Sequence, residues 1–203
     1  MGITLPVIGQ TSWGDENNAC FEQLQDGGLI PNDAGFLSWN SSPQRIVGAS
    51  GAVVSGTVKM ARLPKFTQAK SVTSVCFHIA AAAITPTAGQ CFAGIYRMDG
   101  TRVAVTADIS GSLGVTGIIT YALSGGPVAL AAGEYYAALL QNAATPATLG
   151  QLSSLGVASV LNAGLTAATA FHTDGPTAQT SLPASVTMAS RTLSTHPAWA
   201  GVK

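Results

Sequence analysis

The sequence predicts a mainly β fold, an antiparallel β-sandwich or jelly-roll-like domain, from three observations. Residues 91–106 alternate their side chains with the period of a strand on both sides of an Asp99-Gly100 turn, which is typical of a β-hairpin. Residues 72–80 alternate in the same way. Residues 133–140 form a short apolar run that begins with a glycine and contains two tyrosines. Its length and its aromatic residues favour a buried strand over a helix.

Residues 1–45 differ from the rest and are expected to form an N-terminal extended arm followed by a short helix and a loop. The arm is an apolar segment interrupted by Pro6, which suits an extended conformation better than a helix. The helix is expected to begin near Trp13, to end at Gly27-Gly28 and to be apolar on one face. Such a region has no core of its own, so it must dock on its own sandwich, on sister subunits or on a larger partner. The residues expected to make this anchoring or oligomer contact are Leu5, Pro6, Ile8, Trp13 and Leu24.

Residues 46–203 are expected to form the β-sandwich domain. One or two strands precede Pro64, and the following strand, residues 72–80, places its odd-numbered apolar side chains on one side. In the next hairpin, Asp99 and Gly100 are expected to adopt positive φ in a type I′ turn. Further strands are expected at residues 118–123, 128–130 and 135–141. About seven short strands separated by turns are typical of an antiparallel sandwich or jelly roll.

The pattern weakens after residue 143. Residues 150–170 carry leucines at helical spacing, but their Gly, Ser, Thr and Val content favours a loop with one short strand or turn. Residues 172–176 predict a turn, and residues 182–188 lead towards a last strand. In the earlier apolar run, adjacent tyrosines at 135 and 136 must face opposite sides of the sheet if the strand is regular.

The chain has few charges: Asp, Glu, Lys and Arg make up 9% of the 203 residues, and the formal net charge is zero. A surface with so little charge either lies against other subunits or stays hydrated through Thr, Ser and Ala, and both alternatives stay open. Balanced charge argues against nucleic acid as a partner. No apolar run reaches the length of a membrane span, so membrane insertion is not expected. The loose basic cluster is expected to be the solvated side of a strand and turn, and consists of Lys59, Arg62, Lys65 and Lys70.

The residues of the β region do not group into a catalytic or metal-binding pattern. Asp108, Glu134 and Asp174 have no spacing that suggests a carboxylate pair, and no Gly-x-Ser-x-Gly elbow is present. The three cysteines are irregularly spaced, and Cys76 and Cys91 are expected to act as small buried hydrophobes. His172 with Asp174 could contact a cation, although a hydrogen bond within a turn fits them better. We therefore expect a protein that is not an enzyme and has no catalytic residue, cofactor or metal.

Several segments together carry a resemblance to a known group of proteins. They are Leu5–Gly9, Ser12–Asp15, Gly89-Gln90, Phe92–Tyr96, Asp99–Arg102, Thr106–Asp108, Ala132–Asn142, Leu182–Ser185 and Trp199. This combination resembles domains in minor tail and other virion proteins of tailed bacteriophages, particularly those of actinobacteria. The resemblance spans most of residues 5–200, although no single segment is a specific motif.

The resemblance implies a structural virion protein that is made in the bacterial cytoplasm and then built into the phage particle. Such proteins are usually homotrimers, attached to other virion proteins of tail or capsid by their N-terminus, with a β-rich C-terminal domain on display. The first hypothesis is an appendage of the minor-tail or tail-fibre kind that contacts a host cell-surface glycan. The alternative is a capsid decoration or head fibre protein without a receptor role.

A glycan contact would use exposed aromatic rings, and most aromatic residues of the β region are better explained as core or subunit interface. One of the adjacent tyrosines must point away from the core that the other occupies. The residues proposed as candidates for a surface ligand contact are Tyr136 and Trp199.

Overall fold

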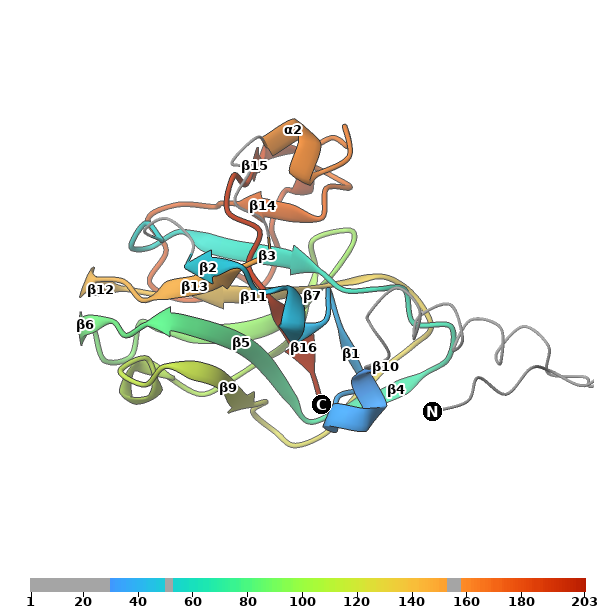
Figure 1. The fold of residues 1–203 in the computed structure, drawn as a ribbon, viewed down its shortest axis with the longest axis horizontal. Helices are drawn as coiled ribbons and strands as arrows, with labels where there is room; N and C mark the ends of the chain where they lie inside the picture. The colour runs from blue at the N-terminus through green and yellow to red at the C-terminus, as the bar shows by residue number, and fades with distance from the viewer. Residues whose placement is uncertain (1–29, 50–52, 153–157) are drawn as a thin grey trace, which may run out of the picture.

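The computed structural model describes residues 30–49, 53–152 and 158–203, and these residues form a mainly β protein (Figure 1). The pairings between its strands are antiparallel, as predicted. Two sheets face each other across one core, so the β-sandwich prediction is confirmed. The predicted N-terminal arm and helix lie outside the described residues.

The first sheet, called sheet 1, is built around the longest strand, β5 (Ser74–Ala81). One edge of β5 pairs with β9 (Gly117–Ala122). Its other edge pairs with β16 (Ala200–Val202) at one end and with β13 (Thr148–Gln151) at the other. Beyond these lie the short strands β1 (Ser38–Trp39), next to β16, and β2 (Gly48–Ala49), next to β13.

The second sheet, called sheet 2, contains six strands. Their order is β15 (Thr192–Leu193), β14 (His172–Asp174), β3 (Val58–Arg62), β11 (Tyr135–Leu140), β7 (Phe92–Arg97) and β8 (Arg102–Val105). Two small ribbons pair β4 (Lys70–Val72) with β10 (Val128–Leu130), and β6 (Ile84–Pro86) with β12 (Ala143–Thr145). The helical turns are η1 (Pro31–Ala34), η2 (Pro43–Arg45), η3 (Ser110–Ser112), α2 (Ala158–Leu161) and η4 (Met188–Ser190).

The main core lies between the two sheets and follows the alternation predicted from the sequence. In β5, Val75, Phe77 and Ile79 are buried in this core, as expected for one side of a strand. From sheet 2, Ile95 and Leu139 meet them. The predicted strands at residues 72–80, 118–123, 128–130 and 135–141 are therefore present within one or two residues of the expected bounds.

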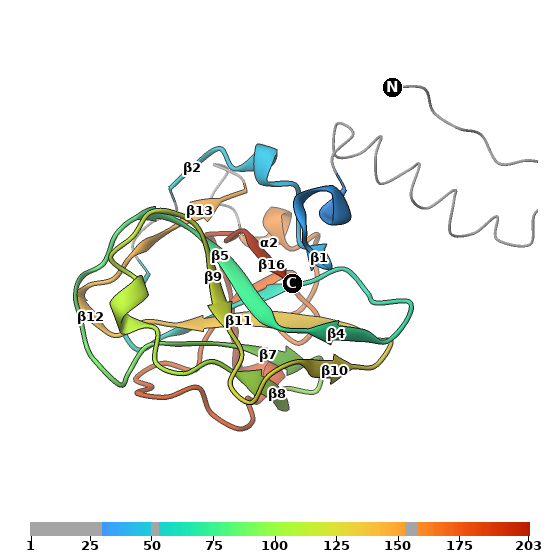
Figure 2. The same cartoon turned by 90° about the horizontal axis from the view of Figure 1, so that it is seen from below.

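The outer face of sheet 2 is also buried, because the segments before and after β14, residues 162–171 and 175–191, fold back over it. These segments, here called the cover, contribute Leu182, Val186 and Met188 to a second apolar cluster that includes Tyr136. Figure 2 shows part of the cover, in orange, beyond β7 and β8. Tyr135 lies in the main core, so the two tyrosines do face opposite sides, but both are buried.

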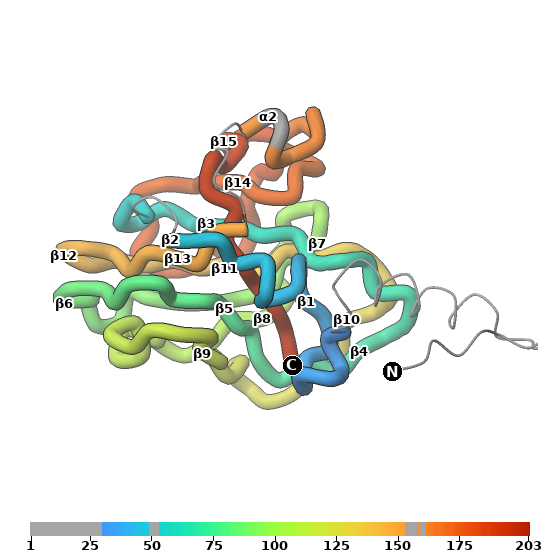
Figure 3. The backbone as a smooth tube through the Cα atoms, viewed as in Figure 1, coloured from blue at the N-terminus to red at the C-terminus, as the bar shows by residue number. Residues whose placement is uncertain are grey.

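Residues 30–46 cover the outer face of sheet 1 around β16 and β5, where they pack Phe36 and Trp39 against Trp199 and Cys76. Figure 3 traces the red C-terminal end of the chain, β16, beside the blue strand β1. The expected division after residue 45 therefore differs from the structure, since residues 30–45 supply both a strand and a core cluster of the sandwich. The cluster buries the Trp199 ring, which lies far away in the sequence and would otherwise be exposed to solvent on this face.

The tip of the predicted hairpin is a different turn from the expected type I′. Of the two central residues, only Gly100 has positive φ, at 89°. The Gly100 N–H donates to the Arg97 carbonyl at 3.0 Å, which gives a three-residue loop with glycine in the left-handed region. The Asp99 carboxylate accepts a hydrogen bond from the Thr101 N–H at 2.8 Å, and this local bond holds Asp99 outside the left-handed region.

Residues 172–176, predicted as a turn, also differ. Residues 172–174 form strand β14, which pairs with β3 on one side and β15 on the other. The Gly-Pro pair that suggested a turn follows the strand instead of interrupting it. Because β14 needs β3 as a partner, 110 or so residues earlier in the chain, local sequence gives little sign of it.

Candidate functional site

Charged side chains gather around an open groove of about 630 Å³ at one end of sheet 2. Its lining includes Lys65, Arg97, Asp99 and Glu134. The sheet order explains this gathering. Because β3 and β7 both flank β11 and run antiparallel to it, their C-terminal ends meet where β11 begins.

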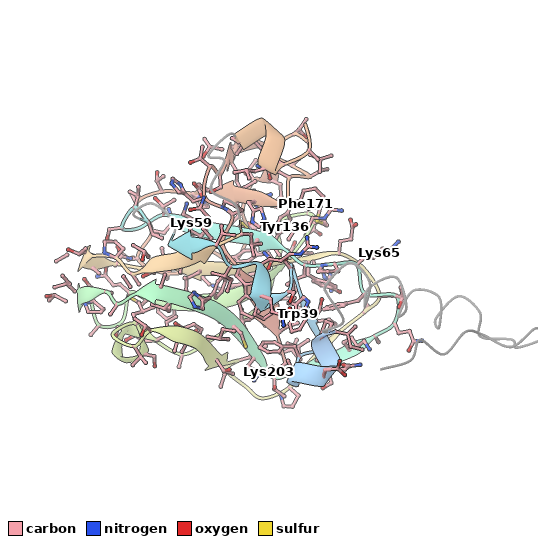
Figure 4. The ribbon with its side chains drawn as sticks, viewed as in Figure 1. Trp39, Lys59, Lys65, Tyr136, Phe171 and Lys203 are labelled. Atoms are coloured by element: carbon pink, nitrogen blue, oxygen red, sulfur yellow. The ribbon has the colours of Figure 1, made fainter. Side chains whose placement is uncertain are left out.

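An exposed aromatic ring lies next to this groove. Phe171 is 40% exposed, and it is the one aromatic ring among the large exposed hydrophobic side chains of the described residues. The Arg62 guanidinium lies over it, 5.5 Å from the ring centroid, and is also paired with the Glu134 carboxylate at 2.5 Å. A further hydrogen bond of 2.8 Å joins Arg62 Nη1 to the Thr169 carbonyl. Figure 4 labels two residues of this region, Phe171 and Lys65. We call Phe171, Arg62, Glu134 and the groove the Phe171 site.

The Phe171 site has the chemical features of a surface that binds a polar ligand with one apolar face. A phenyl ring offers a flat apolar platform, and a fixed guanidinium and carboxylate offer oriented donors and acceptors beside it. Arg62 is held by three neighbours, so it does not need to be ordered when a ligand binds. The site can therefore position a ligand, such as a sugar, by stacking and hydrogen bonding.

The sequence prediction placed the surface contact elsewhere, and the structure corrects it. Tyr136 and Trp199 are both 0% exposed, so the prediction that these two rings meet a surface ligand is wrong. The Tyr136 hydroxyl donates to the Ala170 carbonyl at 2.8 Å, under the cover (Figure 4). The Trp199 indole N–H donates to the Ser41 carbonyl at 2.6 Å, under residues 30–46. Each ring fills the interface between a sheet and the segment that covers it.

Sequence reasoning missed Phe171 as a surface residue. The available signal was an aromatic residue standing alone in a stretch of Ala, Thr and Leu, where a core position would have apolar neighbours at strand or helix spacing. The predicted anchoring residues lie outside the described part of the chain, so their roles stay predictions; they are Leu5, Pro6, Ile8, Trp13 and Leu24.

A second polar cluster lies at the edge of the main core, between β3 and β14. Lys59 Nζ is 2.8 Å from Asp174 Oδ1 and 3.4 Å from the Ser194 hydroxyl. Lys59 is buried, so the expectation that it belongs to a solvated basic face is wrong: its partner Asp174 faces it directly across the β3–β14 pairing. The space among these side chains is about 10 Å³, which is close to the room that one water molecule needs. A substrate does not fit there.

His172 belongs to this second cluster and is buried with its Nδ1 atom lacking a hydrogen-bond partner. Burial, together with the nearby Lys59 charge, lowers the pKa of His172 to about 4. The imidazole is therefore neutral near pH 7. Its role here is to fill space beside an ion pair, and the expected turn hydrogen bond with Asp174 is absent from its described contacts.

Asp108, considered above as a potential catalytic acid, is used to fix loops. Its carboxylate accepts hydrogen bonds from the Gly89 N–H at 2.9 Å, the Cys91 N–H at 3.2 Å and the Ser110 hydroxyl. Burial alone would raise the pKa of Asp108, but these hydrogen bonds together hold it below its ordinary value. The carboxylate thus ties the start of β7 to the loop that follows β8.

The two described cysteines are buried free thiols, as predicted. Burial raises the pKa of both Cys76 and Cys91, which keeps them protonated and unreactive. Within the described ranges, no group of three or more His, Cys, Asp and Glu side chains is placed to hold a metal ion. Among the helices that the structure describes, none has the length and hydropathy of a membrane span.

The chain enters the sandwich beside a second groove, of about 760 Å³, between residues 30–45 and the loop 64–70. Ile30, Trp39 and Phe66 form part of its wall, and Lys65 and Lys70 lie on its loop side. The C-terminal residue is close by, with the Lys203 ammonium 4.6 Å from the Phe36 ring centroid. Residues 1–29 are therefore joined to the sandwich at the same end as the C-terminus.

Comparison with known proteins adds no identity: no protein-family model matches the chain, and no curated protein sequence matches it significantly.

Proposed function

We propose that this protein is a structural virion protein of a tailed bacteriophage, an appendage of the minor-tail or tail-fibre kind. Residues 1–29 attach it to another virion protein, and the sandwich is displayed. The protein binds its partners and catalyses no reaction. The homotrimer that the resemblance implies is part of this proposal.

One observation supports this proposal most directly. The segments that resemble phage virion domains are scattered in the sequence, but several of them lie side by side in the fold. Phe92–Tyr96 lies in β7, Asp99–Arg102 forms the hairpin tip, and Ala132–Asn142 contains β11, the neighbour of β7. Thr106–Asp108 is tied to the start of β7 by the Asp108 hydrogen bonds. Proteins that share a fold keep similar residues where those residues pack together. The position of these segments in one packed unit therefore supports the resemblance as a likeness of structure.

The displayed sandwich offers the Phe171 site as its contact with a host cell-surface glycan. The ring and the Arg62–Glu134 pair replace Tyr136 and Trp199 in this role. Such contacts are weak one at a time, and repeated copies on a particle would multiply them into avidity.

Two experiments test the proposal. The first is electron microscopy of phage particles in which this protein carries a label. Label on the tail is the expected result. Label on the head would show that the protein is a capsid decoration protein and not an appendage. Particles without label would overturn the virion role.

The second experiment measures binding of the full chain to host cell-wall polysaccharide. Phe171→Ala is expected to weaken binding at least about tenfold, because stacked aromatic contacts contribute on the order of 1 kcal/mol or more in each of several copies. Ile84→Ala is the matched control, since Ile84 is an exposed apolar residue at 61% exposure on the β6 ribbon. Equal binding by both variants would remove the Phe171 site from the proposal. Hydrolysis of the polysaccharide by the purified protein would contradict its non-enzymatic part.

A further inference from the structure

Charge is divided unevenly along this chain. All nine Lys and Arg residues lie within residues 30–203, together with five Asp and Glu residues, so this part has a formal charge of +4. Residues 1–29 contain no Lys or Arg and have a formal charge of −4. Their four carboxylates belong to Asp15, Glu16, Glu22 and Asp26. The zero net charge of the chain therefore hides an acidic segment joined to a basic sandwich, and such opposite charges attract each other.

Positive charge lines the groove of about 760 Å³ at which the chain enters the sandwich, here called the entry groove. Its lining includes Arg45, Lys65 and Lys70, and no Asp or Glu of the described residues belongs to it. Neither Lys65 nor Lys70 forms an ion pair with a described carboxylate, because the two described ion pairs involve other residues. Figure 4 labels Lys65 and Trp39, two residues of this lining. The groove thus offers two ammonium groups to an acidic ligand.

The tether brings the acidic residues to this groove. Ile30, the first described residue, is part of the groove wall. Asp26 precedes it by four residues, and an extended chain spans at most about 3.6 Å per residue, so the two Cα atoms lie within about 14 Å of each other. A tether this short gives an effective concentration on the order of millimolar, at which even weak contacts form for much of the time.

The spacing of three acidic residues matches one face of the helix predicted from the sequence. Asp15, Glu22 and Asp26 recur at i, i+7 and i+11, which places them on the same face. The apolar residues of the predicted helix have the same spacing two positions earlier, and they are Trp13, Cys20 and Leu24. Because two residues turn a helix by about 200°, the acidic face and the apolar face are opposite each other.

We propose that the entry groove binds the acidic face of residues 15–26 of the same chain, through ion pairs with its two lysines. The groove favours this face over the apolar one because its aromatic residues are already packed into the sandwich, with Trp39 at 3% exposure and Phe66 at 4%. Lys65, in contrast, is exposed. The oppositely charged partners are joined by the chain, so their pairing does not require a second molecule.

Docking in this orientation directs the apolar face of the segment away from the sandwich. That face is then available for the contact with another virion protein. This use of the apolar face rests on the proposed function, whereas the docking itself does not. The tests below use the purified full chain, so their outcome is independent of where the protein is found on a particle.

The first test is zero-length cross-linking of the full chain with a carbodiimide, which joins a carboxylate to an amine that contacts it. Peptide mapping is expected to find Glu22 and Asp26 joined to Lys65 or Lys70, at a yield several-fold above that of links to Lys203. Lys203 is the matched control because it lies at the same end of the sandwich and outside the groove lining. Equal yields at the three lysines, or no link to the two groove lysines, would overturn the proposal.

The same reaction on an equal mixture of isotope-labelled and unlabelled chains identifies the source of the segment. Both peptides of each cross-linked pair are expected to have the same labelling, because they come from one chain. Pairs that combine a labelled with an unlabelled peptide would show that a second copy fills the groove, and this would contradict the proposal.

The second test measures the rate at which chymotrypsin cleaves the full chain after Phe21, next to Glu22. The double substitution Lys65→Gln and Lys70→Gln is expected to raise this rate at least about threefold, because cleavage requires the segment to leave the groove. Arg97→Glu is the control, since it lowers the net charge by the same two units at an exposed position outside the groove lining. It is expected to be cleaved at the wild-type rate. Equal rates for the double variant and the control would rule out docking through the lysines.

Discussion

Arg191 is a buried cation held by neutral groups. It is 4% exposed, and its guanidinium donates to the Thr173 hydroxyl, to the Ala167 carbonyl at 3.1 Å and to the Met188 carbonyl at 3.4 Å. The guanidinium carbon is also 4.6 Å from the centroid of the Tyr136 ring. These contacts join sheet 2 to the cover, so a single side chain fixes the position of a segment that has little regular structure of its own.

We therefore expect Arg191→Met to lower the free energy of unfolding by about 2 to 4 kcal/mol, because it removes the donors and leaves buried carbonyls without partners. Urea unfolding followed by fluorescence measures this. The matched control is Arg97→Met at an exposed position, which should change the free energy of unfolding by less than about 0.5 kcal/mol. Equal effects of the two substitutions would show that Arg191 contributes no more than a surface arginine.

His172 makes stability depend on pH. In the unfolded chain it takes up a proton below its ordinary pKa of 6.5, whereas in the folded protein burial and the Lys59 charge lower its pKa to about 4. The unfolded state thus binds more protons between these values. The stabilising contribution is complete above pH 6.5 and is lost as the pH falls towards 4.

Between pH 7.5 and pH 5, the free energy of unfolding of the wild type should fall by about 2 kcal/mol through this residue. His172→Phe keeps a ring of similar size and should abolish that part of the pH dependence. Urea midpoints of both proteins at the two pH values provide the test. Parallel pH profiles for wild type and variant would mean that His172 is not the titrating group. Asp99 and Asp108 do not interfere, since their pKa values lie below this pH range in the unfolded chain and lower still in the folded protein. Burial also lowers the pKa of His78, and this contribution is shared by the wild type and the variant.

At the scale of elements, the hairpin tip between β7 and β8 is clamped by the cover. The Val186 N–H donates to the Gly100 carbonyl at 2.9 Å. A Cβ atom at Gly100 would lie 1.9 Å from the Val186 carbonyl oxygen, and the residue also has positive φ. Glycine is therefore required here for two independent reasons, one conformational and one steric.

Gly100→Ala should reduce the free energy of unfolding by about 3 kcal/mol or more, because the cover must move away from the hairpin. Gly125→Ala separates the conformational effect from the steric effect. Gly125 has a similar φ of 85°, but nothing lies within 4 Å of its added Cβ, so only conformational strain of about 1 kcal/mol is expected. Thermal unfolding of the two variants measures the difference. Equal losses of stability in the two variants would mean that the cover moves away from the hairpin at no cost in free energy.

The elements that could be predicted are those with a local signal. β5, β7, β9 and β11 show strand alternation or a compact apolar run, and each was found from the sequence. β1, β14 and β16 are two or three residues long and depend on partners far away in the chain, so their sequences contain no pattern of their own.

The same reason explains the errors at the site. Arg62 and Glu134 are 72 positions apart, and their pairing follows from the β3–β11 register. The sequence suggested that Tyr136 and Trp199 could contact a surface ligand. Alternation tells which side of a strand a residue faces, but not whether a further segment covers that side. Both sheets have such covers here.

At the scale of the whole molecule, the sandwich is complete within residues 30–203. Every described strand has its partners there, including β1 and β2 near the N-terminal side. Phe36 and Trp39 cover the outer face of sheet 1 at β16, with the Phe36 ring 5.6 Å from that of Trp199. The boundary that matters for folding is therefore near residue 30.

Two truncations test this boundary. A chain that begins at residue 30 should unfold within about 2 °C of the full chain, because it keeps both sheets and all three apolar clusters. A chain that begins at residue 46 should lose about 3 kcal/mol or more, because Trp199 and Cys76 become exposed. Thermal unfolding distinguishes them. A residue-46 chain as stable as the residue-30 chain would mean that residues 30–45 are only an arm.

The position of β16 has a consequence for how the protein is made. Strand β16 lies between β1, the first described strand, and β5, so sheet 1 cannot close until residues 200–202 have left the ribosome. Until then, one edge of β5 and the surface under Trp199 have no partner. During synthesis, sheet 2 can therefore form before sheet 1 is complete.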